Sequence, residues 1–230
     1  MKIEKNFFSA KKIAYLAVLV ALVVILQLWG SAIPIGPAGL NLSFVLVPIT
    51  LGAIMLGPIC GMILGFVFGF VVLMTGVTGA NFFTAYVFND SPVFTVLTCI
   101  LKGVAAGFVG GLLFKVLSKK NKYVAVFVAS ISVPLVNTGL FILGALCMSG
   151  AIKTFANSYM PDVAGKNIVY IIIIGLVTVN FFIELAINLV CAPAIYTVDN
   201  VVSKQLKSKS ELKSVPCEGQ SSENSETRPE

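Results

Sequence analysis

The sequence contains no histidine, and this absence excludes several kinds of chemistry. Without imidazole there is no Ser-His or Cys-His catalytic pair, and no zinc or haem site with a histidine ligand. The chain also lacks a Walker motif, a D-x-x-D metal motif and a paired carboxylate that would suit acid–base catalysis. We therefore expect no enzyme, no metal and no cofactor. An ATP-driven process would need an ATPase on another chain.

Cysteine is scarce and unpaired in the sequence. None of the five cysteines forms a C-x-x-C pair, and four of them lie in apolar runs. They are Cys60, Cys99, Cys147, Cys191 and Cys217. We interpret them as apolar packing residues rather than as redox or metal-binding groups.

Charge is also scarce. Charged residues make up 11% of the chain and hydrophobic residues 57%, whereas soluble domains carry about 25% charged residues. This composition predicts an integral membrane protein, with the lipid bilayer as its surroundings. The net charge of +6 comes mainly from lysines outside the apolar runs, so we expect no binding to nucleic acid.

The apolar runs predict an all-α protein with six transmembrane helices. The expected helices cover residues 13–29, 42–56, 58–75, 92–117, 123–148 and 168–196. The second is short for a full crossing and contains Pro48, so we expect it to be tilted, kinked or partly buried in protein. The polar segments divide the chain into an N-terminal segment (1–12), a membrane domain (13–197) and a tail (198–230) that we expect to be disordered.

The distribution of basic residues predicts the orientation. Four lysines precede the first helix, four lie at 115–122, and five basic residues lie in the tail. The loops after the first and third predicted helices carry no basic residue, and the loop after the fifth carries two. By the positive-inside rule, both termini are cytoplasmic.

Glycines recur every four residues in two of the predicted helices. Gly57, Gly61, Gly65 and Gly69 form one series, and Gly103, Gly107 and Gly111 form another. On a helix this spacing makes a stripe without side chains, where another helix can approach closely. The spacing alone is also typical of general packing between membrane helices.

Four polar residues within the spans form the strongest candidate site. Lys102 and Glu184 are the charges well inside the predicted spans, and Asn137 and Asn180 lie in the fifth and sixth helices. Counted from the outer helix ends, Lys102, Asn137 and Asn180 lie about 15–18 Å deep at about 1.5 Å per residue, with Glu184 one turn deeper. We expect a binding site there, with Thr138 beside Asn137. Intramembrane ionisable residues often mark functional sites.

The loop at 77–92 is rich in asparagine and aromatic residues, including Asn81 and Asn89. We expect this loop to cover the site as a lid. A purely structural alternative remains open, in which Lys102 and Glu184 form a buried ion pair and the asparagines join helices. Both hypotheses hold together if Glu184 positions Lys102 for a ligand.

Four stretches of sequence carry a family resemblance. They are KKIAYLAVLVAL (11–22), LSFVLVPITLGAIMLGPICGMILG (42–65), LKGVAAGFVGGLLFK (101–115) and NFFIELAINLVCAPAI (180–195). In this order and on a six-helix plan, the chain resembles the substrate-binding S component of energy-coupling factor (ECF) vitamin transporters over residues 11–197. The loops and the fifth helix depart from the family pattern.

The resemblance implies a subunit that captures a micronutrient and docks onto a transmembrane T component carrying two ATPase subunits. In this family an A-x-x-x-A pattern in the first helix contacts the T component, and Ala17 and Ala21 match it. Lys102 favours a ligand with a carboxylate or phosphate, so pantothenate is the first candidate substrate and riboflavin the second. The alternatives are a self-contained secondary transporter or channel that uses Lys102 and Glu184 in an ion path, and a structural membrane subunit without a ligand.

Overall fold

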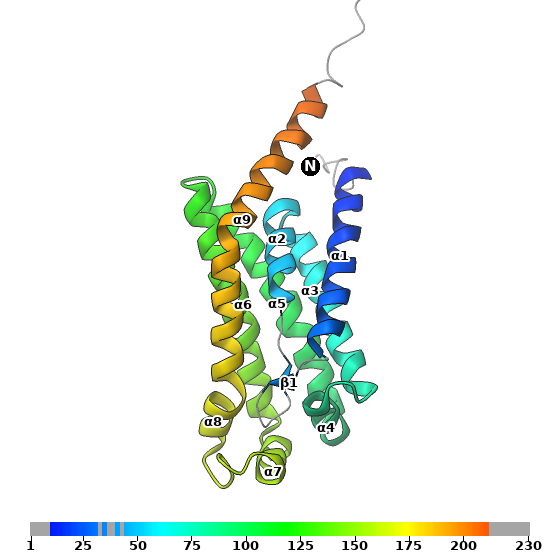
Figure 1. Ribbon diagram of the computed structural model, residues 1–230, viewed down its shortest axis with the longest axis vertical. Helices are drawn as coiled ribbons and strands as arrows, with labels where there is room; N and C mark the ends of the chain where they lie inside the picture. The colour runs from blue at the N-terminus through cyan, green and yellow to red at the C-terminus, as the bar shows by residue number, and fades with distance from the viewer. Residues whose placement is uncertain (1–9, 32–33, 36–39, 42–43, 212–230) are drawn as a thin grey trace, which may run out of the picture.

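The computed structural model describes residues 10–31, 34–35, 40–41 and 44–211. They form a bundle of helices with one pair of two-residue strands at one side (Figure 1). The main helices are α1 (Ala10–Ser31), α2 (Leu46–Leu56), α3 (Pro58–Val77), α5 (Pro92–Leu117), α6 (Lys122–Cys147) and α9 (Thr178–Glu211). The shorter elements are α4 (Phe82–Asp90), α7 (Ser149–Tyr159), α8 (Ile168–Tyr170), the π-helical η1 (Ile171–Val177), and strands β1 (Pro34–Ile35) and β2 (Leu40–Asn41), which pair antiparallel.

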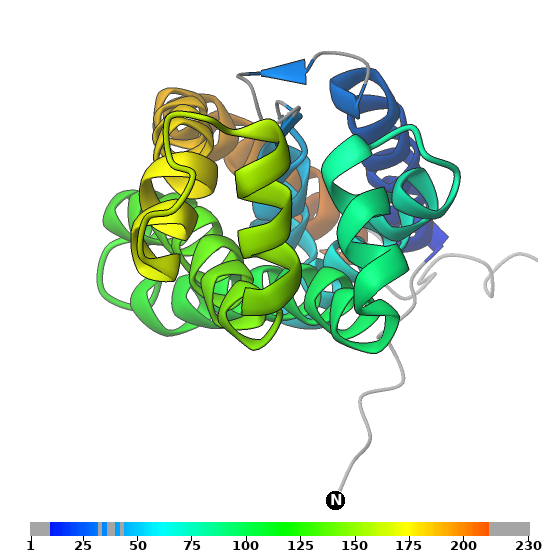
Figure 2. The same ribbon diagram turned by 90° about the horizontal axis from the view of Figure 1, so that it is seen from below.

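Five of the described helical segments are long and apolar enough to cross a membrane. The sixth, α2, has 11 residues and is about 16 Å long, roughly half of a hydrocarbon core about 30 Å thick. It packs against α1, α3, α5, α6 and α9, and Figures 1 and 2 both place it inside the bundle. The all-α membrane fold is therefore confirmed, and the short second helix is buried in protein.

Two predicted loops and one predicted helix end were wrong in part. The loop at 77–92 contains helix α4, and the loop at 149–167 contains helix α7. The last helix continues through Glu211, past the predicted domain boundary at 197. The rest of the predicted tail, residues 212–230, lies outside the described residues, as do residues 1–9 of the N-terminal segment.

The two glycine series bring α3 and α5 into backbone contact. A Cβ atom on Gly65 would overlap the carbonyl oxygen of Gly103, and one on Gly107 would overlap that of Gly61. Gly57, with φ of 99°, makes the turn between α2 and α3, a conformation that L side chains rarely adopt. The stripe thus serves packing within the fold and places the face of α5 that bears Lys102 against α3.

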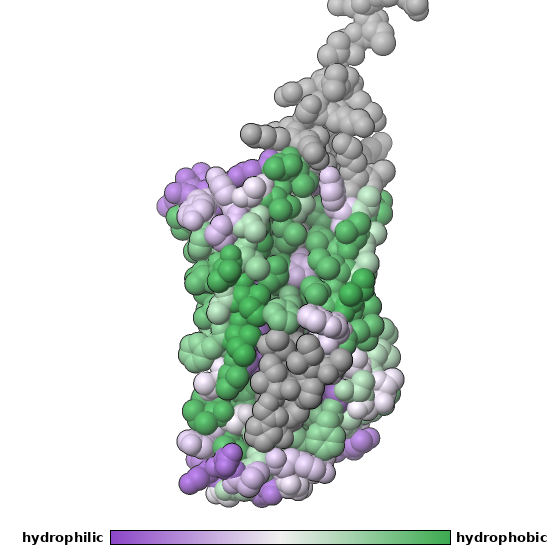
Figure 3. Space-filling view, in the orientation of Figure 1, coloured by the Kyte–Doolittle hydropathy of each residue, from purple (hydrophilic) through white to green (hydrophobic). Residues whose placement is uncertain are grey.

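The two ends of the bundle differ in composition. The start of α1 and the end of α9 lie at one end, with the lysine-rich α5–α6 turn, whereas α4 and α7 lie at the other (Figure 1). At the first end, Lys122 forms an ion pair with Asp199 at 2.6 Å. Polar residues gather at both ends and an apolar band lies between them (Figure 3). The positive-inside rule assigns the lysine-rich end to the cytoplasm, so we refer to the α4–α7 end as the outer end.

Candidate functional site

A cavity of about 120 Å³ lies in the outer half of the bundle. Six of the seven residues predicted to form a site line it: Asn81, Lys102, Asn137, Thr138, Asn180 and Glu184. The other lining residues are Gln27, Phe68, Val72, Phe83, Thr84, Val87, Thr95, Thr98, Cys99, Phe141, Met148, Leu176, Val177 and Phe181. Residues from α1, α3, α4, α5, α6, η1 and α9 thus meet at one place, although the sequence predicted contributions only from the last three long helices and the 77–92 loop.

Lys102 contributes the cationic group of the cavity. Its Nζ atom lies 5.6 Å from the ring centre of Phe68 on α3 and 5.4 Å from that of Phe141 on α6. Contacts between an ammonium group and ring faces at this range are attractive, and they gain strength away from water. The close approach of α3 and α5 next to Gly103 positions Phe68 beside this lysine.

Asn137 lies on α6 just after a break in the helical hydrogen bonds. Pro134 has no N–H group, so the regular bond to the carbonyl of Ser130 is missing. Asn137 is 6% exposed, and its Oδ1 atom has no hydrogen-bond partner among the described residues. A buried amide oxygen without a partner is costly, which makes this position a candidate for ligand contact.

Glu184 lies on α9 and is 2% exposed. Its Oε1 atom accepts a hydrogen bond of 3.0 Å from Nδ2 of Asn180, one turn earlier on the same face. Its Oε2 atom is buried without a partner in the described part of the chain. The side chain is therefore held at one oxygen only.

The structural alternative of a Lys102–Glu184 ion pair is wrong. Across the described residues, Lys122 and Asp199 form the one ion pair within 4.0 Å. Lys102 is surrounded by rings, and Glu184 is hydrogen bonded to an amide. The two charged groups share a cavity without neutralising each other directly.

The remaining asparagines have separate roles. Asn81 begins α4, where its Oδ1 accepts a 2.9 Å bond from the backbone N–H of Thr84. Asn89 is exposed and lies away from the cavity lining, so the structure does not bring it to the site. Asn188 donates to the backbone oxygen of Glu184 at 3.0 Å and accepts from Thr50 at 3.1 Å, joining α9 to α2. It is a packing residue, as the structural hypothesis expected of asparagines.

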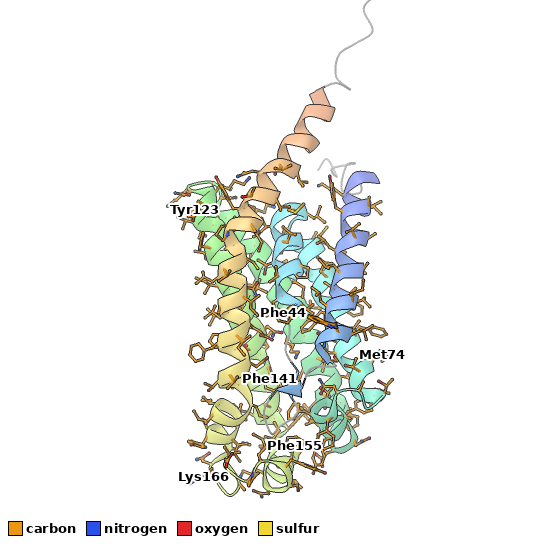
Figure 4. The ribbon with its side chains drawn as sticks, viewed as in Figure 1. Phe44, Met74, Tyr123, Phe141, Phe155 and Lys166 are labelled. Carbon is orange, nitrogen blue, oxygen red and sulfur yellow. The ribbon has the colours of Figure 1, made fainter. Side chains whose placement is uncertain are left out.

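Helices α4 and α7 pack against each other at the outer end of the bundle through aromatic contacts (Figure 1). Phe155 of α7 is fully buried and packs edge-on against Phe83 and Tyr86 of α4, with ring centres 5.2 Å apart in both pairs. Figure 4 places Phe155 and Phe141 in the outer half and Tyr123 at the opposite end. The segment that we expect to act as a lid thus contains a helix held by aromatic packing, and Phe83 of this helix also lines the cavity.

Several cavity residues escaped the sequence prediction. Gln27 of α1 is 5% exposed, and it is the one amide side chain in an otherwise apolar run, which was a usable signal. Thr98 and Thr95 of α5 lie one and two turns before Lys102, respectively, and share its face. Threonine is common in membrane helices as a packing residue, so its spacing alone carried little information.

Ala17 and Ala21 are exposed on α1. The buried face of this helix is formed by Leu19, Val23 and Gln27, on the opposite side. The two alanines therefore do not pack inside the bundle. They make a shallow surface on a helix face that otherwise carries large apolar side chains.

Comparison with known proteins gives one match. A family model described as "ECF transporter, substrate-specific component" matches residues 11–196, which include every residue of the cavity. No curated protein and no solved structure matches the chain.

Proposed function

Because the chain belongs to the family of substrate-specific components of ECF transporters, we propose that it captures a water-soluble vitamin or a related micronutrient from outside. It is a multi-pass protein of the plasma membrane and the substrate-capture subunit of an ECF transporter. The observation that supports capture in this cavity is the gathering of buried polar groups in the outer half of an apolar bundle. Such groups are costly in a membrane unless they serve a ligand or each other.

The proposed substrate site consists of Lys102, Asn137, Thr138, Asn180 and Glu184, with Asn81 at the lid. Hydrophobic walls with a few converging polar groups are typical of small-molecule sites. Pantothenate is the first candidate because its carboxylate can pair with Lys102. Riboflavin is the second, because it has no carboxylate to pair with Lys102.

The proposed partners are a transmembrane T component and two ATPase subunits. The chain itself would perform no chemical reaction, and ATP hydrolysis on the other chains would drive uptake. The exposed surface at Ala17 and Ala21 supports this proposal, because small side chains allow another helix to approach closely.

Purification of the tagged chain from its native membrane tests the proposal. A T component and two ATPase subunits should co-purify, and a small molecule should be released on denaturation of the complex and identified by mass spectrometry. Co-purification of the chain without any ATPase, together with ion-driven uptake by the chain alone in vesicles, would favour the secondary transporter.

A further inference from the structure

Two acceptor atoms at the cavity have no partner within the protein. Glu184 and Asn137 are both more than nine-tenths buried, and Oε2 of the first and Oδ1 of the second lack hydrogen bonds among the described residues. Both residues line the same cavity. Buried acceptors are rarely left without a donor, because each costs free energy in the folded state.

The third polar group at the cavity has the opposite character. The ammonium group of Lys102 carries three donors and no acceptor, and in the described structure it contacts the rings of Phe68 and Phe141 rather than a carboxylate. The cavity therefore offers donors and a positive charge from α5, and acceptors and a carboxylate from α6 and α9.

From this arrangement, and resting on the capture function proposed above, we propose that the substrate is a two-ended compound. One end is a carboxylate that accepts from Lys102. The other end is a hydrogen-bond donor, either a hydroxyl or an ammonium group, that donates to Glu184 and Asn137. Glu184 is thus a specificity-determining residue that selects for the donor.

This class excludes two simpler kinds of ligand. A plain carboxylic acid would pair with Lys102 but would leave Oε2 of Glu184 without a hydrogen-bond donor once the ligand had displaced water from the cavity. It would also bring a second carboxylate close to that of Glu184, and the two would repel each other. A neutral flavin would supply donors but no anion for Lys102. The ring walls at Phe68, Phe141 and Phe181, together with the small volume, suit a compact apolar body between the two ends.

Two matched pairs of compounds test the proposal on the full-length chain in detergent. Pantothenate is compared with N-(3,3-dimethylbutanoyl)-β-alanine, which keeps the carboxylate and the branched body but lacks both hydroxyls. L-Phenylalanine is compared with 3-phenylpropionate, which lacks the ammonium group. In at least one pair, the compound with the donor should bind at least about tenfold more tightly, as expected for a hydrogen bond to a charged group. The pair that responds identifies the donor as hydroxyl or ammonium.

The variant Glu184→Gln should weaken this preference, because its one remaining acceptor is a neutral amide oxygen and a hydrogen bond to a charged oxygen is the stronger kind. Asp199→Asn is the matched control. It makes the same change from acid to amide at a residue that is 4% exposed at the cytoplasmic end, so the preference should persist. Thermal unfolding of each variant without ligand checks that it is folded.

A preference of unchanged size in folded Glu184→Gln overturns the role of Glu184. Equal binding within both pairs, or no binding of any of the four compounds, overturns the two-ended class. The capture function is judged separately, by co-purification of the T component and by the compound extracted from the native complex. An extracted compound without a carboxylate, or without a hydroxyl or ammonium group, contradicts the class while leaving the capture function intact.

Discussion

Asn180 and Glu184 are joined by a hydrogen bond of 3.0 Å along one face of α9, and this bond occupies only one of the two carboxylate oxygens. The bond explains how a carboxyl group that is 2% exposed keeps a defined position although no cation of the described residues lies within ion-pair distance. Lys102, which the sequence suggested as its partner, stays against the aromatic rings. The site therefore contains a basic group and an acidic group that are both available to a ligand.

Replacing Lys102 by Met should weaken binding of an acidic ligand such as pantothenate by about 10- to 100-fold, the range expected for loss of a charge-assisted hydrogen bond. The unfolding temperature should change little, because Lys102 forms no ion pair among the described residues and the thioether of methionine can keep contact with the rings of Phe68 and Phe141. Isothermal titration and thermal unfolding measure the two effects. Lys115→Met, an exposed change on the same helix, is the control. A large loss of stability in Lys102→Met that Glu184→Gln restores would mean that the two residues are paired after all.

Replacing Ala17 and Ala21 together by Leu should abolish uptake in vesicles that contain the whole transporter, and should leave ligand binding by the isolated chain unchanged. Both residues are exposed, so larger side chains block a partner helix rather than the bundle. Leu22→Trp, at the flank of the same face, should be tolerated better. Loss of ligand binding in the double variant would place the alanines in internal packing.

Asn81→Ser should weaken ligand binding, because it removes the side-chain amide at the cavity while keeping an oxygen that can cap α4. Asn89→Ser should have no effect, since Asn89 is exposed away from the cavity. The test compares the ligand affinities of the two variants with that of the unchanged chain in the same assay. Equal losses in both variants would indicate a general effect on the lid rather than a contact at Asn81.

Gly65→Ala should destabilise the protein by about 1–3 kcal/mol, the usual cost of overpacking, because its methyl group meets the backbone of α5. Gly139→Ala is the matched control in α6, where an added Cβ has no neighbour within 4 Å. It should leave stability unchanged or raise it by about 0.4–1 kcal/mol. Thermal unfolding in one detergent compares the two. A tolerated Gly65→Ala would contradict the close approach of α3 and α5.

Truncation after Ser203 should leave insertion, folding and ligand binding intact. The cavity lies at the outer end, and its residues all precede residue 185. The Lys122–Asp199 ion pair is also retained. Binding by the truncated chain should match that of the full chain in the same assay, and a loss would show that the end of α9 or the segment beyond it supports the site.

Much of the site was predictable from the depth of polar residues. In a membrane helix each residue adds a fixed rise, so Lys102, Asn137 and Asn180 could be assigned to one layer by counting from the helix ends. The same reasoning could not predict the contribution of Gln27, because a single amide in α1 gives no indication of which neighbours it faces. Nor could it distinguish Asn81 from Asn89, because both lie in one polar segment and only the structure places them at opposite ends of α4.

The sequence by itself determined the membrane class, the helix order and the expected orientation, since these depend on hydrophobicity and charge along the chain. It also marked the glycine faces that another helix can approach closely, whereas the structure showed that these two faces meet each other. Only the tertiary structure decided that Lys102 contacts Phe68 and Phe141 while Glu184 bonds Asn180. That choice depends on how each helix is rotated about its axis and which partner lies nearest, and the order of residues in the chain does not specify either.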